Sequence, residues 1–164
     1  MGMIHRPRKS QFIACPVNDE CVTATTIRRL PFSAIELTCD ATQNPLDPTC
    51  VTDEYFSVWF KFTAPRNMTI GANTIHSNYD TILGVYTGTC ANLTEVACSD
   101  DDGPGYTSLV FFEALAGKTY YFKASGFDND DCGQLFLNIF QVPPYANGIE
   151  IGAITRLAAS KKQK

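Results

Sequence analysis

The chain of 164 residues is 45% hydrophobic and 12% aromatic, a composition that suits one globular domain and argues against intrinsic disorder. No apolar run approaches the roughly 18 residues of a membrane-spanning helix. Residues 1–14 and 156–164 hold seven bases and no acid. The rest of the chain therefore carries 17 acids against six bases, a net charge of −11, which argues against nucleic-acid binding.

The chain begins with a polar and basic leader. Residues 1–14 turn apolar only at their end and lack the apolar core of a secretory signal peptide, so we expect a tail or an extra strand here. β-branched residues between Val22 and Thr38, with alternation at Ile35 and Leu37, predict an early strand.

A loop is predicted between Cys39 and Cys50. It contains the turn-forming dipeptides Asn44-Pro45 and Asp47-Pro48. A Cys39–Cys50 disulfide would close this loop. In the alternative each cysteine bonds elsewhere, since four cysteines already allow three connectivities.

The strongest strand signal covers Tyr55–Thr63. Its alternate residues are uniformly apolar, and we place them in the core: Phe56, Val58, Phe60 and Phe62. Trp59 lies on the opposite, mixed face. It is a candidate ligand platform because an indole ring stacks on sugars and peptides. The alternative is that a loop or a neighbouring segment covers it.

Two asparagines lie in N-x-[ST] sequons. Asn67 precedes a short strand predicted over Met68–Thr74, and Asn92 lies in an excursion between Cys90 and Cys98. Both are candidate glycosylation sites, and a glycan on Asn92 would point outwards. Either matters only if the source organism glycosylates asparagine.

The densest run of strand signals lies in the middle of the chain. β-rich segments at Thr81–Thr87, Thr107–Ala114 and Thr119–Ser125 are separated by Gly-rich turns, and this spacing predicts a β-sandwich or barrel. We expect a Cys90–Cys98 disulfide to staple the excursion after the first segment. Closing so short a loop removes unfolded-state entropy worth roughly 2.5 kcal/mol.

An acidic turn follows the second of these cysteines. It holds Asp100, Asp101 and Asp102, and Asp80, which precedes the first β-rich segment, could approach them in space. Ca²⁺ takes six to eight oxygen ligands, so these four aspartates are a candidate Ca²⁺ site, although their spacing is not that of an EF-hand. A second acidic turn at 128–131 is a weaker candidate. The alternative is that both turns are simply solvated.

The last strong strand signal is Gln134–Val142, which Pro143-Pro144 ends. Residues 149–154 alternate again like a strand. Such a strand folds back on its own domain or adds to the sheet edge of a neighbouring subunit.

Seven cysteines are a high count for this length. None lies in a CxxC pair, and only His5 and His76 could add imidazole ligands, so disulfides are expected rather than a zinc site. Disulfides imply an oxidising, extracellular compartment. The odd count leaves one cysteine over.

Catalytic motifs are missing from the sequence. It has no HExxH, no G-x-S-x-G and no phosphate loop, and neither histidine lies in a motif typical of a catalytic triad. We therefore predict that the protein is not an enzyme.

Five short motifs occur in one order along the chain: Asn18–Cys21, Ser57–Pro65, Tyr79–Leu83, Cys98–Gly103 and Ala116–Phe122. Together they resemble the bacterial and archaeal pre-peptidase C-terminal-like domains. The resemblance implies an all-β, jelly-roll-like sandwich of two sheets and about eight or nine strands. It also implies a non-catalytic, extracellular module, sometimes stabilised by calcium, that is appended to secreted hydrolases and surface proteins.

The resemblance also divides the chain and its cysteines. It implies an N-terminal extension over 1–17, the sandwich over 18–142 and a C-terminal extension over 143–164. Because Cys21 and Cys132 both belong to the family-like region, we pair them. Cys15 is then left for an intermolecular bond or as a free, buried thiol.

Two functions fit these features. The first is a structural extracellular subunit that assembles into a filament or surface layer through its terminal strands. The strand-capable termini, the basic tails beside an acidic body and the odd Cys15 favour it. The second is a secreted binding or adhesion module that attaches an enzyme or cell surface to polysaccharide or protein, favoured by the resemblance and by Trp59. We lean slightly to the structural role.

Overall fold

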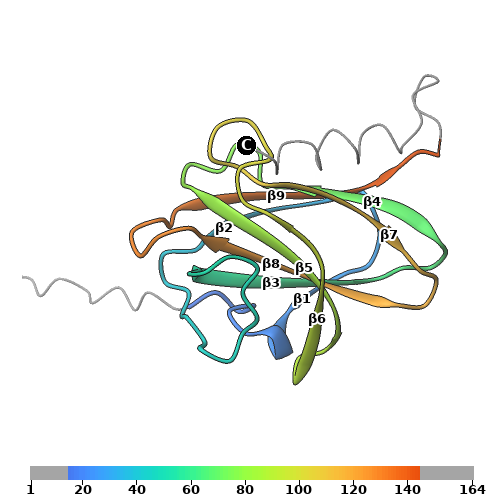
Figure 1. Cartoon of the computed structure of the whole chain (residues 1–164), viewed down its shortest axis with the longest axis horizontal. Coiled ribbons are helices and arrows are strands. Elements are labelled where there is room, and N and C mark those ends of the chain that lie inside the picture. Colours follow the sequence, from blue (N-terminus) through green and yellow to red (C-terminus); the bar gives the residue numbers. More distant parts are fainter. Residues whose placement is uncertain (1–14, 145–164) are drawn as a thin grey trace, which may run out of the picture.

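The structure, a computed structural model, describes residues 15–144 as a sandwich of two β-sheets (Figure 1). The five-stranded sheet has the order β1 (Thr25–Ile27), β3 (Tyr55–Thr63), β8 (Thr119–Gly126), β5 (Thr81–Thr89) and β6 (Asn92–Ser99). The four-stranded sheet has the order β2 (Phe32–Leu37), β9 (Gln134–Val142), β4 (Met68–Asn73) and β7 (Leu109–Ala114). The predicted all-β sandwich of two sheets is confirmed.

Only β1 and β3 run parallel; every other pair of neighbouring strands is antiparallel. The described part of the chain has one helix, a 3-10 turn (η1) at Cys21–Thr23, and no described helix is long and apolar enough to cross a membrane. The strand-capable segments expected in 1–14 and 149–154 lie outside the described residues.

Alternating side chains of the strands build the core between the two sheets. Val58, Phe60 and Phe62 of β3 point into it, with exposed fractions of 4% or less, as the sequence predicts. Phe56 is only half-buried, because the chain forms a bulge between Tyr55 and Val58 and Phe56 takes a φ of 53° there. Burial of each such aromatic or branched side chain stabilises the fold by roughly 1.5–3 kcal/mol.

The sequence analysis misses one strand. Where it predicts an excursion between Cys90 and Cys98, the structure has β6, an edge strand paired with β5 along its whole length. Most side chains of β6 are exposed or half-buried. The apolar alternation that marks a half-buried strand is therefore weak in this segment.

The six predicted disulfide cysteines do form three disulfides, but in other pairs: Cys21–Cys90, Cys39–Cys132 and Cys50–Cys98. The predicted Cys90–Cys98 bond is wrong because Cys90 lies in the turn of the β5–β6 hairpin and Cys98 lies opposite Gly84. About six residues, or roughly 20 Å of strand, separate the two. A disulfide tolerates a Cα–Cα distance of only about 7 Å.

Strand register explains the other two corrections. Leu37 pairs with Gln134 in antiparallel β2 and β9, so Cys39 and Cys132, each two residues beyond, face each other with a Cα–Cα distance of 4.8 Å. The predicted Cys39–Cys50 and Cys21–Cys132 bonds are therefore wrong. Cys15 has no disulfide partner and is exposed rather than buried. An intermolecular bond at Cys15 stays a prediction.

A loop of residues 39–54, here called the cap loop, lies over the outer face of the five-stranded sheet. Beneath it is a second, small apolar cluster formed by Cys21, Ala24, Trp59 and Tyr86. Two of the disulfides border this cluster, since Cys21–Cys90 ties η1 to the β5–β6 turn and Cys50–Cys98 ties the cap loop to β6. The part of this outer face that carries Trp59 and Tyr86 is thus covered rather than free for a ligand.

Candidate functional site

Two strand ends bring most of the predicted cation ligands together. Asp80 immediately precedes β5, and Asp100 immediately follows β6. Because these strands are antiparallel, with Leu83 opposite Ser99, the start of one and the end of the other meet at the same end of the sandwich. One carboxylate oxygen from each of Asp80, Asp100 and Asp101 lies within 4.8 Å of the other two. We call these three residues the aspartate cluster.

Burial and crowding change the titration of the aspartate cluster. Burial first, and then the negative charges of Asp101, Asp100 and Asp131, raise the pKa of Asp80 to about 6. Burial also raises the pKa of Asp100, and the charges of Asp101 and Asp102 act in the same direction. The Oδ1 atoms of Asp80 and Asp100 are shielded from solvent and have no hydrogen-bond partner among the described residues. A bound cation would relieve the repulsion among these carboxylates.

Buried hydroxyl groups fix the loops that carry the cluster. Thr81 Oγ1 lies 2.6 Å from Thr74 Oγ1, and Ser108 Oγ donates to the carbonyl of Thr81 at 2.6 Å. The Ser108 N–H donates to Thr74 Oγ1 at 2.8 Å, and the Leu109 N–H donates to Ser99 Oγ at 2.9 Å. Satisfied networks of this kind are rigid. The loops before β5 and after β6 therefore hold the carboxylates in a defined arrangement.

An open cleft of about 750 Å³ adjoins the aspartate cluster. Residues 75–80 and 104–107 line it, together with Asp131. The ring of Tyr106 is 69% exposed in this lining. The cleft therefore combines an exposed aromatic ring with carboxylate, amide and hydroxyl groups. Such a lining can stack on a polar, ring-shaped ligand and form hydrogen bonds with it.

The remaining predicted acidic residues have other surroundings. Asp102 lies on the same turn as the cluster but outside the group of three. The second acidic turn is closed by its own carboxylates: the Asp128 N–H donates to Asp131 Oδ2 at 3.1 Å, and the Asn129 N–H donates to Asp128 Oδ1 at 2.7 Å. Asp131 also lines the cleft and raises the pKa of Asp80, so this turn contributes to the same site.

Both sequon asparagines are exposed. The side-chain oxygen of Asn67 accepts a hydrogen bond from the Ala116 N–H at 2.8 Å, and Asn92 is the first residue of β6 rather than part of an irregular excursion. Glycosylation of either asparagine stays a prediction.

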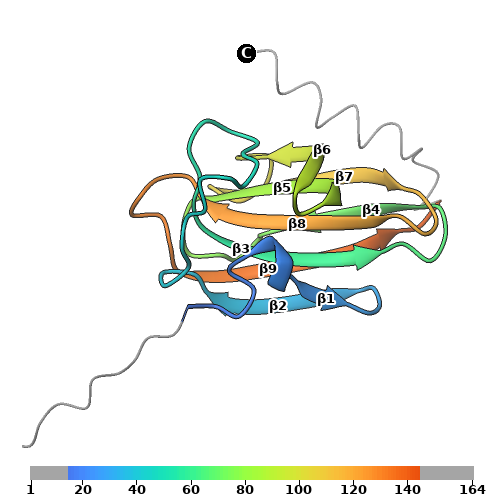
Figure 2. The same ribbon diagram turned by 90° about the horizontal axis from the view of Figure 1, so that it is seen from below.

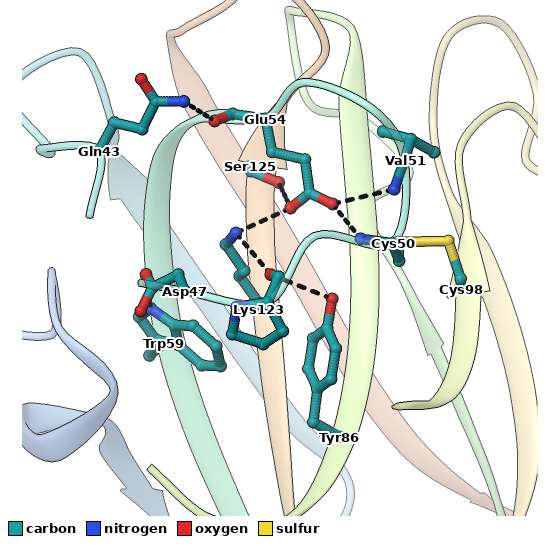
Figure 3. Close-up of polar contacts among 11 residues, drawn as sticks. Gln43, Asp47, Cys50, Val51, Glu54, Trp59, Tyr86, Cys98, Lys123 and Ser125 are labelled. Carbon is teal, nitrogen blue, oxygen red and sulfur yellow. Dashed lines mark hydrogen bonds and ion pairs between the residues drawn. A yellow bond between two sulfur atoms is a disulfide. The ribbon is translucent and has the colours of Figure 1, made fainter. Parts of the chain in front are cut away.

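Trp59, the predicted ligand platform, is fully buried under the cap loop. Its Nε1 donates to Asp47 Oδ2 at 3.3 Å, and its ring centroid lies 6.0 Å from that of Tyr86 (Figure 3). The platform prediction is wrong, and the alternative of a covering loop is confirmed. The physical reason is that Asp47 supplies the one acceptor that a buried indole N–H needs.

A buried ion pair holds the cap loop in place (Figure 3). Lys123 Nζ lies 3.0 Å from Glu54 Oε2 and also donates to the carbonyl of Pro48 at 3.0 Å. The same Glu54 oxygen accepts from Ser125 Oγ at 2.9 Å, and the other oxygen accepts from the Cys50 N–H at 2.6 Å. Every charged group here has partners, so the arrangement is structural.

The sequence analysis does not identify the cleft or Tyr106. Its lining comes mainly from two loops more than 20 residues apart in the chain, with Asp131 from a third segment. The pairing of β4 with β7 and the hydrogen bond from the Thr81 N–H to the carbonyl of Tyr106 bring the two loops together. A single tyrosine in a Gly- and Pro-containing turn carries no periodic signal. The sequence analysis does identify the acidic residues of this site, namely Asp80, the turn at 100–102 and the weaker candidate at 128–131.

Two comparisons with known proteins find similarities to this chain. A T9SS-associated family described as galactose binding domain-like matches residues 17–139 of the chain. Among solved structures, the chain is similar to the pre-peptidase C-terminal domain of collagenase from Bacillus anthracis. The identity is 13% and the TM-score 0.45, over 73% of this chain and 94% of that one. This is the class of domain that the sequence motifs resemble.

No curated protein matches the chain. The family match covers well over half of the chain. It contains strands β1 to β8 and the part of β9 that ends at Ile139. The chain therefore belongs to the T9SS-associated family of galactose-binding-domain-like modules.

Proposed function

We propose that this domain is a non-catalytic accessory module of an extracellular protein, and that it binds carbohydrate in the cleft beside the aspartate cluster. Membership of the galactose-binding-domain-like family carries the proposal. The three disulfides support an oxidising, extracellular location. The comparisons favour this module over a self-assembling subunit, whose main support came from terminal segments outside the described residues.

The cleft has the groups that a saccharide needs. The exposed ring of Tyr106 can pack against the apolar face of a sugar ring. The carboxylates of Asp80 and Asp131, which also line the cleft, can accept hydrogen bonds from sugar hydroxyls. Hydrogen bonds to charged acceptors are the stronger ones and set orientation, whereas stacking supplies contact area.

Retention on insoluble polysaccharides tests the proposal. We expect the full chain to be retained on a galactose-containing polysaccharide, and Tyr106→Ala to lose most of this retention. Phe127→Ala is the matched control, because Phe127 is an exposed aromatic residue (47%) that does not line the cleft. Absence of retention on every polysaccharide in a panel would contradict the proposal. Equal retention of the Tyr106 variant would also contradict it.

We further propose that Ca²⁺ completes the aspartate cluster. Three carboxylate oxygens lie within 4.8 Å of one another, and two of these residues have a shielded oxygen without a partner among residues 15–144. This arrangement supports a cation that prefers oxygen ligands. We expect Ca²⁺ to raise the melting temperature relative to chelator, and Asp101→Asn to weaken this effect. Asp130→Asn, an exposed acid outside the cluster, is the control with the same change in charge. Identical melting curves with Ca²⁺ and with chelator would refute the cation site.

A further inference from the structure

The end of the sandwich opposite the aspartate cluster is basic. Thr81, next to the cluster, pairs with Gly126 at the end of β8, whereas Thr119 at the start of β8 pairs with Thr63. The turns β1–β2, β3–β4 and β7–β8 therefore gather at the far end (Figure 2). Four of the six basic residues in the described part of the chain lie on these turns: Arg28, Arg29, Arg66 and Lys118.

Three of these basic residues line one small pocket. Its volume is about 250 Å³, and its lining includes Arg28, Arg29 and Arg66 and no acidic residue. The guanidinium groups are on exposed residues, whereas Phe62 and Met68 are 4% and 8% exposed and form the apolar bottom. We call this the arginine pocket. It is smaller than the roughly 300–1,000 Å³ cavities of drug-sized ligands, so it fits a single ring with one anionic group.

The arginines of the pocket have no acidic partner among the described residues. Arg66 donates to Gln141 Oε1 at 2.6 Å, a contact that orients its guanidinium without neutralising it. Among residues 15–144 no carboxylate lies within 4.0 Å of Arg28, Arg29 or Arg66, since the one ion pair there is Glu54–Lys123. In this acid-rich domain, three arginines that line one pocket and lack acidic partners among the described residues are an electrostatic exception. Guanidinium groups bind carboxylate and sulfate through paired hydrogen bonds.

We propose that the arginine pocket binds an anionic group, a carboxylate or a sulfate, on a sugar ring of an acidic polysaccharide. The inference rests on the proposed function in one respect: the anionic group belongs to a carbohydrate. The guanidinium groups pair with the anion, and the apolar bottom packs against the C–H face of the ring.

Calorimetric titration of the full chain with small probes tests the inference. Trigalacturonate and galactose 6-sulfate distinguish carboxylate from sulfate, and neutral galactotriose reports on the cleft. We expect the double variant Arg28→Gln, Arg66→Gln to weaken binding of the preferred anionic probe about tenfold or more, and to leave galactotriose unaffected. The control variant Lys118→Gln, at the same end of the sandwich but outside the pocket, should change the affinity for the anionic probe less than twofold.

Three results would overturn the inference. The first is no binding of either anionic sugar, and the second is an equal loss in the Lys118 variant, which would indicate non-specific attraction. The third is equally tight binding of triglutamate, which would assign the pocket to an acidic peptide. The two proposals fail separately. If galactotriose does not bind but an anionic sugar binds with the expected arginine dependence, the cleft proposal fails and the arginine pocket stands.

Discussion

Acidic groups meet opposite surroundings in two regions of this domain, one buried and one partly open to solvent. Under the cap loop, both oxygens of Glu54 are bonded, one of them to the ammonium group of Lys123. In the aspartate cluster, Asp80 and Asp100 each have a shielded oxygen with no partner among the described residues, and their neighbours are also acidic. The contrast separates a charge that stabilises the fold from the crowded charges for which we propose a cation as partner.

The largest expected effect is in the first region. Lys123→Met leaves the Glu54 carboxylate buried without its cation, and we expect a loss of about 3–5 kcal/mol in the free energy of unfolding, measured by denaturant titration. The double variant Glu54→Gln, Lys123→Met removes both charges and should be clearly more stable than the single variant. Equal stability of the single variant and the natural sequence would show that the ion pair does not hold the cap loop.

The next largest effect concerns the bond that ties the cap loop to β6. Replacing both Cys50 and Cys98 by Ser opens a loop closed over 48 residues, which should cost about 2–4 kcal/mol of stability. Near-ultraviolet circular dichroism should also change, because the environment of Trp59 loosens. Cys15→Ser, which alters an exposed thiol without a disulfide partner, should change neither property. If the double variant changes neither the stability nor the spectrum, the role assigned to the cap loop is contradicted.

In the aspartate cluster, removing a charge is expected to raise stability rather than lower it. Asp80→Asn removes one of three crowded negative charges, so we expect it to stabilise the cation-free protein, by less than about 1 kcal/mol because the site is partly open to solvent. The same variant should lose the stabilisation that Ca²⁺ gives. A loss of stability in chelator would mean that Asp80 has a structural role.

Acidity offers a smaller test of the same contrast. Because the pKa of Asp80 is about 6 in the folded protein, against 3.8 ordinarily, the folded state binds this proton more readily than the unfolded state does. Protonation of Asp80 therefore stabilises the folded state. This stabilisation is fully present below about pH 3.8 and is lost as the pH rises through about 6. In chelator, the melting temperature should therefore rise as the pH falls from 7 to 5, and Asp80→Asn should flatten this slope. The same slope in both proteins would assign the effect to other groups.

Much of the fold can be predicted from residue patterns. β3 and β9 have the predicted bounds, because in both strands most alternate residues are apolar and pack in the core between the sheets. β6 escapes prediction because an exposed edge strand has little alternation to detect. The disulfides escape it because pairing depends on strand register, which places Cys39 opposite Cys132.

The aspartate cluster and the cap loop also differ in how far the sequence predicts them. The acidic turn of the aspartate cluster is predictable because aspartates are dense in it, whereas its proximity to Asp80 depends on the hairpin between β5 and β6. The sequence does not predict that the cap loop covers Trp59, because the conformation of this loop depends on contacts with distant strands. One such contact is that of Pro48 with Lys123. The arginine pocket likewise forms only when turns far apart in the chain meet at one end of the sandwich.

The most direct test of the central claim is an NMR titration of the isotope-labelled full chain with galactotriose, in Ca²⁺ and in chelator. The account predicts amide shifts concentrated in residues 75–80 and 104–107, with tighter binding in Ca²⁺. Shifts concentrated on the cap loop or on the outer face of the four-stranded sheet would contradict it. So would an unchanged spectrum at millimolar sugar in the presence of Ca²⁺.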